Sequence, residues 1–252
     1  MSDPGASYFA GRDSARLAYR EVGEGRPLVL LHGFAVDASM WLRYGWVETI
    51  AAGGHRVIMP DFRGHGSSAK PHDLASYPPD VLSDDVFALV AHLGLDDYDL
   101  AGYSLGARVV VRMLARGAAP GRAVVAGQGL VEVLGGGGGT DAFVRRVFAG
   151  WGTFAQGSRE WLAEQWLWSN RADPTALLRV LDSIVPTPAE ALDRIQVPTL
   201  VVAGAEDERA ASVDRLAAVL PRGCRAVVPG DHGAASSAPE LAAAIAEFLA
   251  GR

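Results

Sequence analysis

Ser104 lies between two glycines in the stretch GYSLG, residues 102 to 106. The pattern follows a short apolar run and precedes a helical pattern, so the serine is expected at a strand-to-helix turn. At such a turn, side chains two positions before and after the serine would collide with backbone, which explains the glycines. The serine oxygen would stand beside a helix N-terminus, whose N–H groups suit a developing oxyanion. The stretch predicts a nucleophile, with a structural turn as the alternative.

A serine hydroxyl needs a general base to act at neutral pH, and that base is usually a histidine held by a carboxylate. Of the six histidines, His232 sits in a glycine-bounded loop directly after the last predicted strand. Sheet topology would deliver it to the same carboxyl edge as Ser104. His32 and His65 also fall in loops at this edge, but each lies in a glycine turn whose backbone is the more important part.

Three acids, Glu206, Asp207 and Glu208, follow another predicted strand at this edge. Each could instead cap its loop, and composition alone does not choose among them. The order serine, acid, histidine is that of one particular hydrolase architecture.

Apolar runs bounded by glycine, proline or aspartate alternate with helical patterns along the chain. This alternation predicts an α/β fold, with a mostly parallel, doubly wound sheet of about eight strands and helices on both faces. Residues 15–23 alternate apolar and polar side chains, which predicts an antiparallel edge strand. The predicted parallel strands cover 26–33, 55–61, 97–102, 122–128, 197–204 and 224–230. The predicted helices cover 39–52, 81–95, the stretch from the GYSLG turn to about 117, 212–220 and 239–250.

In the helix predicted over 81–95, the apolar residues form one stripe, and Ser83, Asp84 and Asp85 fall off it. These three polar side chains are therefore expected away from the core.

The alternation breaks for some 65 residues after a five-glycine run, residues 135–139. Such a run forms regular structure only at a cost and is expected to act as a flexible connector. The segment beyond it looks helical and holds four of the six tryptophans. We therefore expect a helical cap over 131–190, inserted between two parts of one core domain, 1–130 and 191–252. Additional core is the alternative interpretation of its aromatic residues.

Composition narrows the class of protein. A chain of 252 residues with 49% hydrophobic content can build one sizeable core. The net charge of −6, spread without blocks, predicts neither a nucleic-acid partner nor a membrane partner, and favours a small-molecule substrate. The N-terminal stretch resembles no export signal, so a cytoplasmic location is expected. The single cysteine, Cys224, excludes an internal disulfide or thiolate cluster and is expected in the core.

Five motifs occur in an order that resembles the α/β-hydrolase fold superfamily, in its serine-nucleophile branch. They are LLHGF, DFRGHGSS, GYSLGA, AGAED and GDHG, in chain order. The resemblance implies that Ser104 is the nucleophile, His232 the base and Asp207 the orienting carboxylate. The choice of Asp207 follows the family's spacing counted from Gly204.

The backbone N–H groups of Phe34 and Leu105 would then form the oxyanion hole. Where many relatives have a small residue, this chain has Arg108, for which surface pairing and an inward orientation are both open.

The resemblance also implies a serine hydrolase that forms an acyl-enzyme with an ester, lactone or thioester of a small, largely apolar molecule. It requires no metal and no organic cofactor. Hydrolysis of carbon-carbon bonds, elimination and perhydrolysis use the same triad, and a small-molecule sensor is the non-enzymatic alternative. The oligomeric state is left open. The expected substrate pocket is aromatic and includes Trp41, Tyr103, Trp151, Trp161, Trp166 and Trp168.

Overall fold

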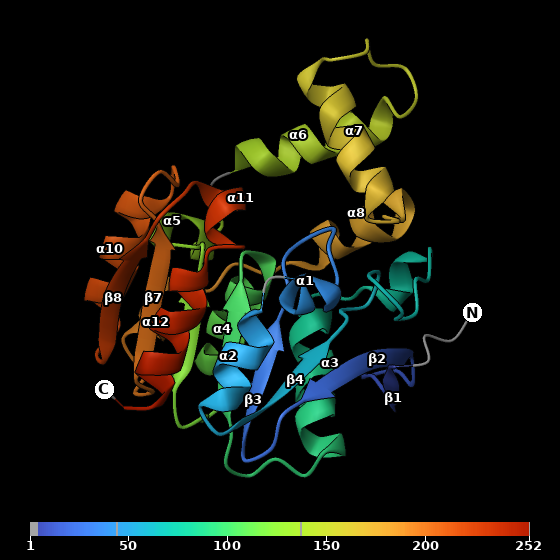
Figure 1. The fold of residues 1–252 in the computed structure, drawn as a ribbon. Coiled ribbons are helices and arrows are strands. Elements are labelled where there is room, and N and C mark those ends of the chain that lie inside the picture. The colour runs from blue at the N-terminus through green and yellow to red at the C-terminus, as the bar shows by residue number, and fades with distance from the viewer. Residues whose placement is uncertain (1–4, 44, 137, 252) are drawn as a thin grey trace.

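An eight-stranded sheet forms the centre of the computed structural model, which describes residues 5–43, 45–136 and 138–251. The strand order is β1-β2-β4-β3-β5-β6-β7-β8 (Figure 1). The β1–β2 and β2–β4 pairs are antiparallel and the other pairs are parallel. The strands are β1 Ser7–Ala10, β2 Arg16–Val22, β3 Arg26–Leu31, β4 His55–Pro60, β5 Asp99–Tyr103, β6 Ala123–Ala126, β7 Thr199–Gly204 and β8 Gly223–Val228. The predicted mostly parallel α/β sheet is confirmed.

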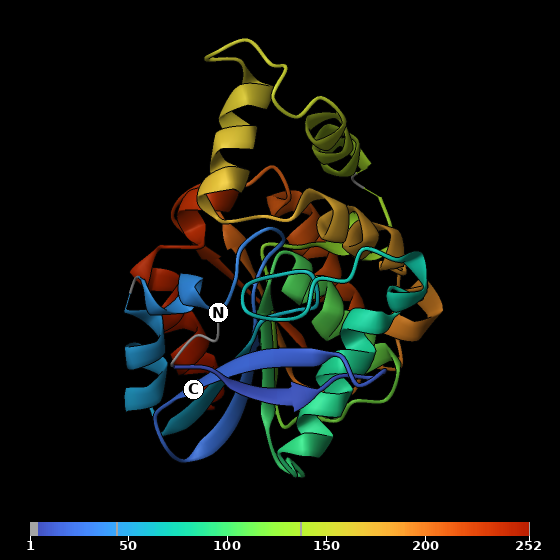
Figure 2. The ribbon, with the colours of Figure 1, turned by 90° about the vertical axis from the view of Figure 1, so that its right-hand side faces the viewer.

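Helices cover both faces of the sheet. Figure 2 views the sheet nearly edge-on, with α2 on one side and α3 on the other. The core against α1, α2 and α12 is separate from the core against α3, α4 and α10. The helices outside the β6–β7 connection are α1 Ser39–Leu42, α2 Trp46–Ala52, α3 Val81–His92, α4 Leu105–Ala115, α10 Ala210–Val219, α11 His232–Ala235 and α12 Pro239–Leu249, with a 3-10 turn, η1, at Leu74–Ser76.

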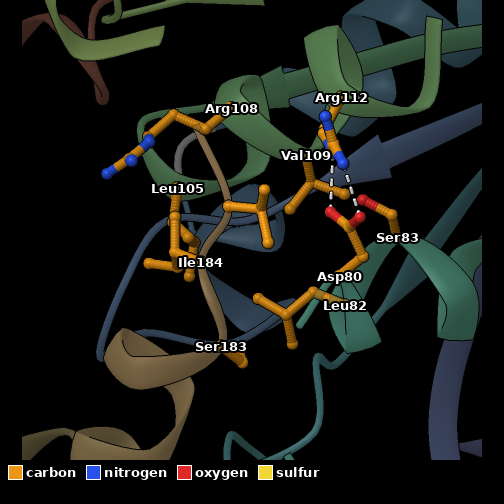
Figure 3. Close-up of a pocket in the computed structure, with 10 residues that line it drawn as sticks. Asp80, Leu82, Ser83, Leu105, Arg108, Val109, Arg112, Ser183 and Ile184 are labelled. Carbon is orange, nitrogen blue, oxygen red and sulfur yellow. Dashed lines mark hydrogen bonds and ion pairs between the residues drawn. The ribbon is translucent and has the colours of Figure 1, made fainter. Parts of the chain in front are cut away.

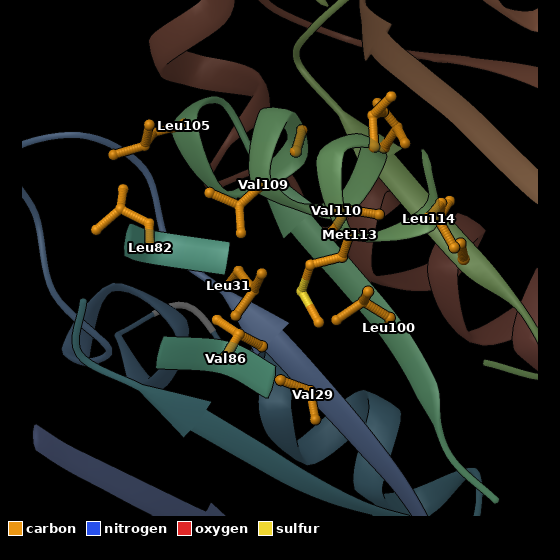
Figure 4. Close-up of a cluster of buried hydrophobic side chains, with 14 of the residues drawn as sticks. Val29, Leu31, Leu82, Val86, Leu100, Leu105, Val109, Val110, Met113 and Leu114 are labelled. Atoms are coloured by element: carbon orange, nitrogen blue, oxygen red, sulfur yellow. The ribbon is translucent and has the colours of Figure 1, made fainter. Parts of the chain in front are cut away.

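Helix α4 is anchored in the larger core through one apolar face. Val109, Val110 and Met113 are buried against the sheet residues Val29 and Leu100 (Figure 4). Because α4 begins directly after the GYSLG turn, this packing fixes the position of Ser104 relative to the sheet.

The strand register brings the predicted site loops to one edge. Leu31 at the end of β3 pairs with Gly102, and Tyr103 at the end of β5 pairs with Ala126. At the other end of the sheet, Gly204 of β7 pairs with Val228 of β8. The segments that follow β3, β5, β7 and β8 therefore leave the sheet at its carboxyl edge, as parallel strands require.

Two predictions near the N-terminus are wrong in detail. The strand within 15–23 is antiparallel, but it is not an edge, because β1 lies outside it. The helix predicted over 39–52 is two helices, and Gly45, which precedes α2, has a φ of +72°. A continuous right-handed helix cannot contain that conformation.

Two polar residues of α3 that were expected outside the core are buried, Ser83 and Asp85. Asp85 accepts two hydrogen bonds from Arg63, at 2.9 and 3.0 Å, and Arg63 is itself 0% exposed. Asp13 pairs with the same guanidinium at 2.7 Å. The sequence pattern located the apolar stripe, but a charged residue can be buried where an opposite charge meets it.

Cys224 was predicted in the core and is exposed. The reason is that β8 is the last strand of the sheet, so that most of its residues are accessible to solvent. An edge strand lacks the second neighbour that buries the central strands.

The connection between β6 and β7 is called the insertion here. Its described residues form five helices: α5 Leu130–Val133, α6 Gly138–Ala149, α7 Arg159–Ser169, α8 Pro174–Ser183 and α9 Ala189–Leu192. Helices α6 and α7 project above the rest of the molecule (Figures 1 and 2). The five-glycine run was expected to be a connector throughout, but α6 begins at Gly138 within it. Among the described helices, none is long and apolar enough to cross a membrane.

Candidate active site

Ser104 occupies a sharp turn between β5 and α4, with φ of +54° and ψ of −113°. A non-glycine residue rarely adopts this conformation, and it marks a strained turn. A Cβ at Gly102 would lie 2.4 Å from the Gly106 carbonyl carbon, and one at Gly106 would lie 2.3 Å from the Leu31 oxygen. Both glycines are therefore required by close backbone contacts.

His232 lies beside the serine, with its Nε2 3.1 Å from the Ser104 Oγ. It is the first residue of α11, after β8. The Tyr103 hydroxyl donates a hydrogen bond to the His232 carbonyl oxygen at 2.6 Å, and the two rings stand 5.3 Å apart. The histidine is thus held through its backbone as well as through its ring.

Asp207 completes the chain of hydrogen bonds, because its Oδ2 lies 2.8 Å from the His232 Nδ1. Its Oδ1 accepts hydrogen bonds from the backbone N–H and the guanidinium of Arg209, both at 3.0 Å. Burial acts to raise the pKa of Asp207, but the hydrogen bonds from His232 and Arg209 hold it below its usual value. The neighbouring acids Glu206 and Glu208 are exposed. Of the three candidate acids, Asp207 is the one that contacts the histidine.

Two backbone donors lie near the serine. Leu105 is the first residue of α4, and the loop after β3 approaches closely enough that a Cβ on Gly33 would lie 3.6 Å from the Ser104 Cβ. Within the described residues, neither the Phe34 N–H nor the Leu105 N–H donates a hydrogen bond. Free N–H groups beside a nucleophile are the donors that an oxyanion needs.

The loop that carries Phe34 is held by His32 and Asp61. The Phe62 N–H donates to the His32 Nε2 at 2.9 Å, which leaves the His32 Nδ1–H to donate to the Gly33 oxygen at 2.7 Å. Asp61 accepts a hydrogen bond from the Ala38 N–H at 2.8 Å. His32 therefore supports the loop as a neutral, buried side chain, and burial lowers its pKa.

Ser104 and His232 open onto a cavity of about 450 Å³ between the sheet edge and the insertion. Its apolar walls come from Phe34 and Leu105 on one side and from the insertion on the other. The insertion residues lining it are Glu132, Gly135, Gly136, Asp141, Val144, Trp166, Leu181, Ile184 and Pro186.

The predicted aromatic pocket is largely wrong. Of its six residues, Trp166 lines the cavity. Trp41 is 1% exposed in the core beneath α1 and α2, and Tyr103 is buried. Trp168 is 72% exposed, and Trp151 packs against a small apolar cluster between the insertion and the loop after β3. The lining does not include Trp161.

Three side chains contribute to the site beyond the triad and the oxyanion hole, and the sequence analysis had singled out one of them, Arg108, with its orientation left open. Gln128 follows β6, is buried, and its amide nitrogen lies 3.5 Å from the Ser104 Oγ. Arg209 holds Asp207, and Arg108 lines the cavity. Gln128 was the last residue of the strand predicted over 122–128, so the rule that located His232, a polar residue in the loop after a predicted strand, did not select it. The observed β6 ends earlier, at Ala126.

No cluster of three or more histidine, cysteine or acidic side chains suited to a metal occurs within the described residues.

Comparison with known proteins identifies the family of the chain. Residues 28–245 match the model of the alpha/beta hydrolase family. The chain is 34% identical over 109 residues to an AB hydrolase superfamily protein of Bacillus subtilis, covering 43% of this chain and 39% of that protein. It is 35% identical over 112 residues to a non-heme haloperoxidase of Rhodococcus erythropolis, covering 43% of this chain and 38% of that protein. Each of these matches spans less than two fifths of the relative's length.

The crystal structure of an enol-lactonase from Burkholderia xenovorans LB400 superimposes with a TM-score of 0.75 at 23% identity, covering 96% of this chain and 99% of that one. At this identity the likeness establishes the fold alone. The family match covers both the GYSLG turn and the loop of His232. The chain belongs to the alpha/beta hydrolase family.

Proposed function

We propose that this hydrolase cleaves carboxylic esters, lactones or thioesters of small molecules through an acyl-enzyme on Ser104. The observation that carries the proposal is the continuous chain of hydrogen bonds from Asp207 through His232 to Ser104, at 2.8 and 3.1 Å, beside the cavity. Nucleophilic acyl transfer uses a strained serine that is hydrogen-bonded to a histidine, which is held in turn by a buried carboxylate.

In the first half-reaction the His232 Nε2 takes the Ser104 proton while the serine oxygen attacks the carbonyl carbon. The Nδ1–H donates to Asp207, which fixes the tautomer that leaves Nε2 free to accept. The N–H groups of Phe34 and Leu105 stabilise the negative oxygen of the tetrahedral intermediate. His232 then gives its proton to the leaving alcohol or thiol.

In the second half-reaction His232 takes a proton from water, which attacks the acyl-enzyme carbonyl carbon. The bond to the Ser104 oxygen then breaks, His232 returns the proton to that oxygen, and the acid is released. The amide nitrogen of Gln128, the second residue after β6, lies 3.5 Å from the Ser104 Oγ. In this proposal its amide orients the serine oxygen between attacks. We further propose that α6, α7 and α8 act as a cap, because residues of all three helices line the cavity.

The test is a panel of methyl and p-nitrophenyl esters, acyl thioesters and γ-lactones, assayed with the wild type and Ser104→Ala. We expect turnover in at least one class, with kcat lowered by roughly 10⁶-fold in the variant. Turnover by Ser104→Ala at the wild-type rate would refute the proposed nucleophile. Because one relative is named as a haloperoxidase, each active ester is also assayed with hydrogen peroxide. Formation of peracid faster than acid would favour perhydrolysis over hydrolysis.

A further inference from the structure

The cavity beside Ser104 contains charged groups that an apolar substrate does not need. Besides His232, the charged residues that line it are Arg108, Glu132, Asp141 and Arg209. Whether each of them already has a partner within the protein decides which could bind a ligand.

Three of these four charges have partners. Arg209 donates to Asp207 at 3.0 Å, and Asp141 accepts from Arg145 at 3.0 Å. Glu132 accepts hydrogen bonds from a backbone N–H at 3.0 Å and from a serine hydroxyl of α10 at 3.1 Å. These contacts stabilise the walls of the cavity. The charged groups that make them already have partners within the protein.

Arg108 is different. Its guanidinium makes no hydrogen bond and no ion pair with any residue that the structure describes, although most of the side chain is buried. Burial lowers the pKa of Arg108, and the more distant charges of Asp141 and Glu132 act in the opposite direction. An arginine that is partly removed from water without a partner is costly for the free protein and favours binding of an anion.

Arg112, the next arginine of α4, has a guanidinium whose hydrogen-bond donors are paired. Arg112 makes two hydrogen bonds with the carboxylate of Asp80, both at 2.6 Å. Figure 3 shows Arg108 directed away from that pair, on the other side of Leu105. Asp80 is therefore already paired with Arg112. The N–H donors of Arg108 point away from that pair.

The position of Arg108 connects it to the reacting serine. The Arg108 backbone N–H donates to the Ser104 carbonyl oxygen at 3.2 Å, so the two residues are one helical turn apart. Residues four apart lie on the same helix face, and side chains lean toward the N-terminus of their helix. Both residues line the same cavity.

We propose that Arg108 binds a free carboxylate of the substrate while Ser104 attacks an ester, thioester or lactone carbonyl a few carbons away. The substrates are then half-esters of short dicarboxylic acids, or lactones that bear an ionised carboxyl group. The guanidinium matches a carboxylate with two parallel N–H donors. The apolar walls at Val144, Leu181 and Ile184 would contact the carbons between the two groups. This inference rests on the proposed function for the position of the scissile carbonyl.

The kinetic test compares esters of similar length with and without the charge: monomethyl adipate against methyl heptanoate, and monomethyl glutarate against methyl hexanoate. Acid release is followed by pH-stat. We expect the wild type to prefer each half-ester. Arg108→Met should lower the ratio of the two kcat/KM values by about 10- to 100-fold, chiefly through KM. Arg108→Lys should restore part of the ratio, because it keeps the charge but not the paired donors.

The matched control is Arg116→Met, the same change at the residue that directly follows α4. Arg116 pairs with Asp84 and does not line the cavity. We expect it to keep the wild-type ratio.

A binding test does not depend on catalysis. Titration calorimetry of Ser104→Ala with glutarate and adipate should detect binding, and adding Arg108→Met should weaken it at least tenfold. Binding by Ser104→Ala in a protein that hydrolyses no ester would refute the proposed function and keep the carboxylate site. Hydrolysis with no preference for half-esters, unchanged by Arg108→Met, would refute the site and keep the function.

Two further outcomes would overturn the assignment. Inorganic phosphate that binds as tightly as glutarate would make Arg108 a general anion site. An equal loss on charged and neutral esters, together with a lowered Tm, would mean that Arg108 holds α6 through Asp141 and binds no substrate carboxylate.

Discussion

The carboxyl edge of the sheet and the insertion meet at one cavity but are built in different ways. At the edge, Ser104, Asp207 and His232 each follow a strand whose register is fixed by its neighbours, and each is held by hydrogen bonds. The helices of the insertion pack around a small apolar cluster that contains Val147 and Leu167 and also Ala35 of the loop after β3, and several large side chains of the insertion face solvent. The difference teaches that the sheet fixes the positions of the three hydrogen-bonded side chains, whereas the insertion supplies most of the remaining cavity wall.

The largest effect on kcat should come from a substitution at the carboxyl edge of the sheet. Asp207→Asn keeps the shape of the side chain but allows the wrong tautomer of His232, so kcat should fall by roughly 10⁴-fold. Steady-state assay of the best ester from the panel measures this loss. Glu206→Gln is the matched control, since Glu206 is exposed beside the same strand. An equal loss in the control would move the orienting role away from Asp207.

The next largest effect should be on the free energy of unfolding, which should differ between a core tryptophan and an insertion tryptophan. Trp41→Ala removes a side chain that is 1% exposed and packs against Trp46, with ring centroids 5.1 Å apart. The free energy of unfolding should fall by about 3 to 5 kcal/mol. Trp168→Ala, at a residue 72% exposed in α7, should change it by less than about 0.5 kcal/mol. Urea titration of both variants checks the contrast, and comparable losses would contradict the placement of Trp41 in the core and of Trp168 in solvent.

The edge should also be the region that responds to mild acid. Burial lowers the pKa of His65 to about 3. An unfolded histidine titrates near about 6.5, so the unfolded state binds more protons below that pH. The stabilisation is therefore complete above about pH 6.5 and declines as the pH falls toward the folded pKa.

For His65 alone, the free energy of unfolding should drop by about 1.4 kcal/mol between pH 7.5 and 5.5. Urea titrations at the two pH values measure the drop. His65→Gln should reduce it, because glutamine does not titrate. An identical drop in the variant would show that His65 does not couple the edge to pH.

The smallest effect should come from the cavity face of the insertion. Trp166 lines the cavity and is 48% exposed. Trp166→Ala should raise KM about fivefold for esters that reach it, which corresponds to about 1 kcal/mol of lost apolar contact. Trp168→Ala should leave KM unchanged. A larger change for Trp168 than for Trp166 would mean that another face of α7 meets the substrate.

The same contrast explains what the sequence could predict. The glycines around Ser104 and the loops of Asp207 and His232 were readable because a tight turn and a parallel sheet permit few alternatives. Among the three candidate acids, the family's spacing selected Asp207. In the structure, Asp207 is hydrogen-bonded to His232.

The residues that line the pocket could not be predicted, because an aromatic composition does not indicate which helix faces line the cavity. Trp41 belongs to the core, Trp168 faces solvent, and Trp166 lines the cavity. The burial of Asp85 and Arg63 could not be predicted either, because their ion pair joins residues far apart in sequence and leaves no local pattern. Cys224 was misplaced because an apolar run does not reveal whether its strand lies at the edge of the sheet.

The central claim is that Ser104 is a nucleophile activated by His232. The most direct measurement is intact-mass spectrometry after treatment with a fluorophosphonate, followed by mapping of the labelled peptide. We predict one label per wild-type chain, located on Ser104, and none on Ser104→Ala. An unlabelled wild type, or equal labelling of the variant, would contradict the account.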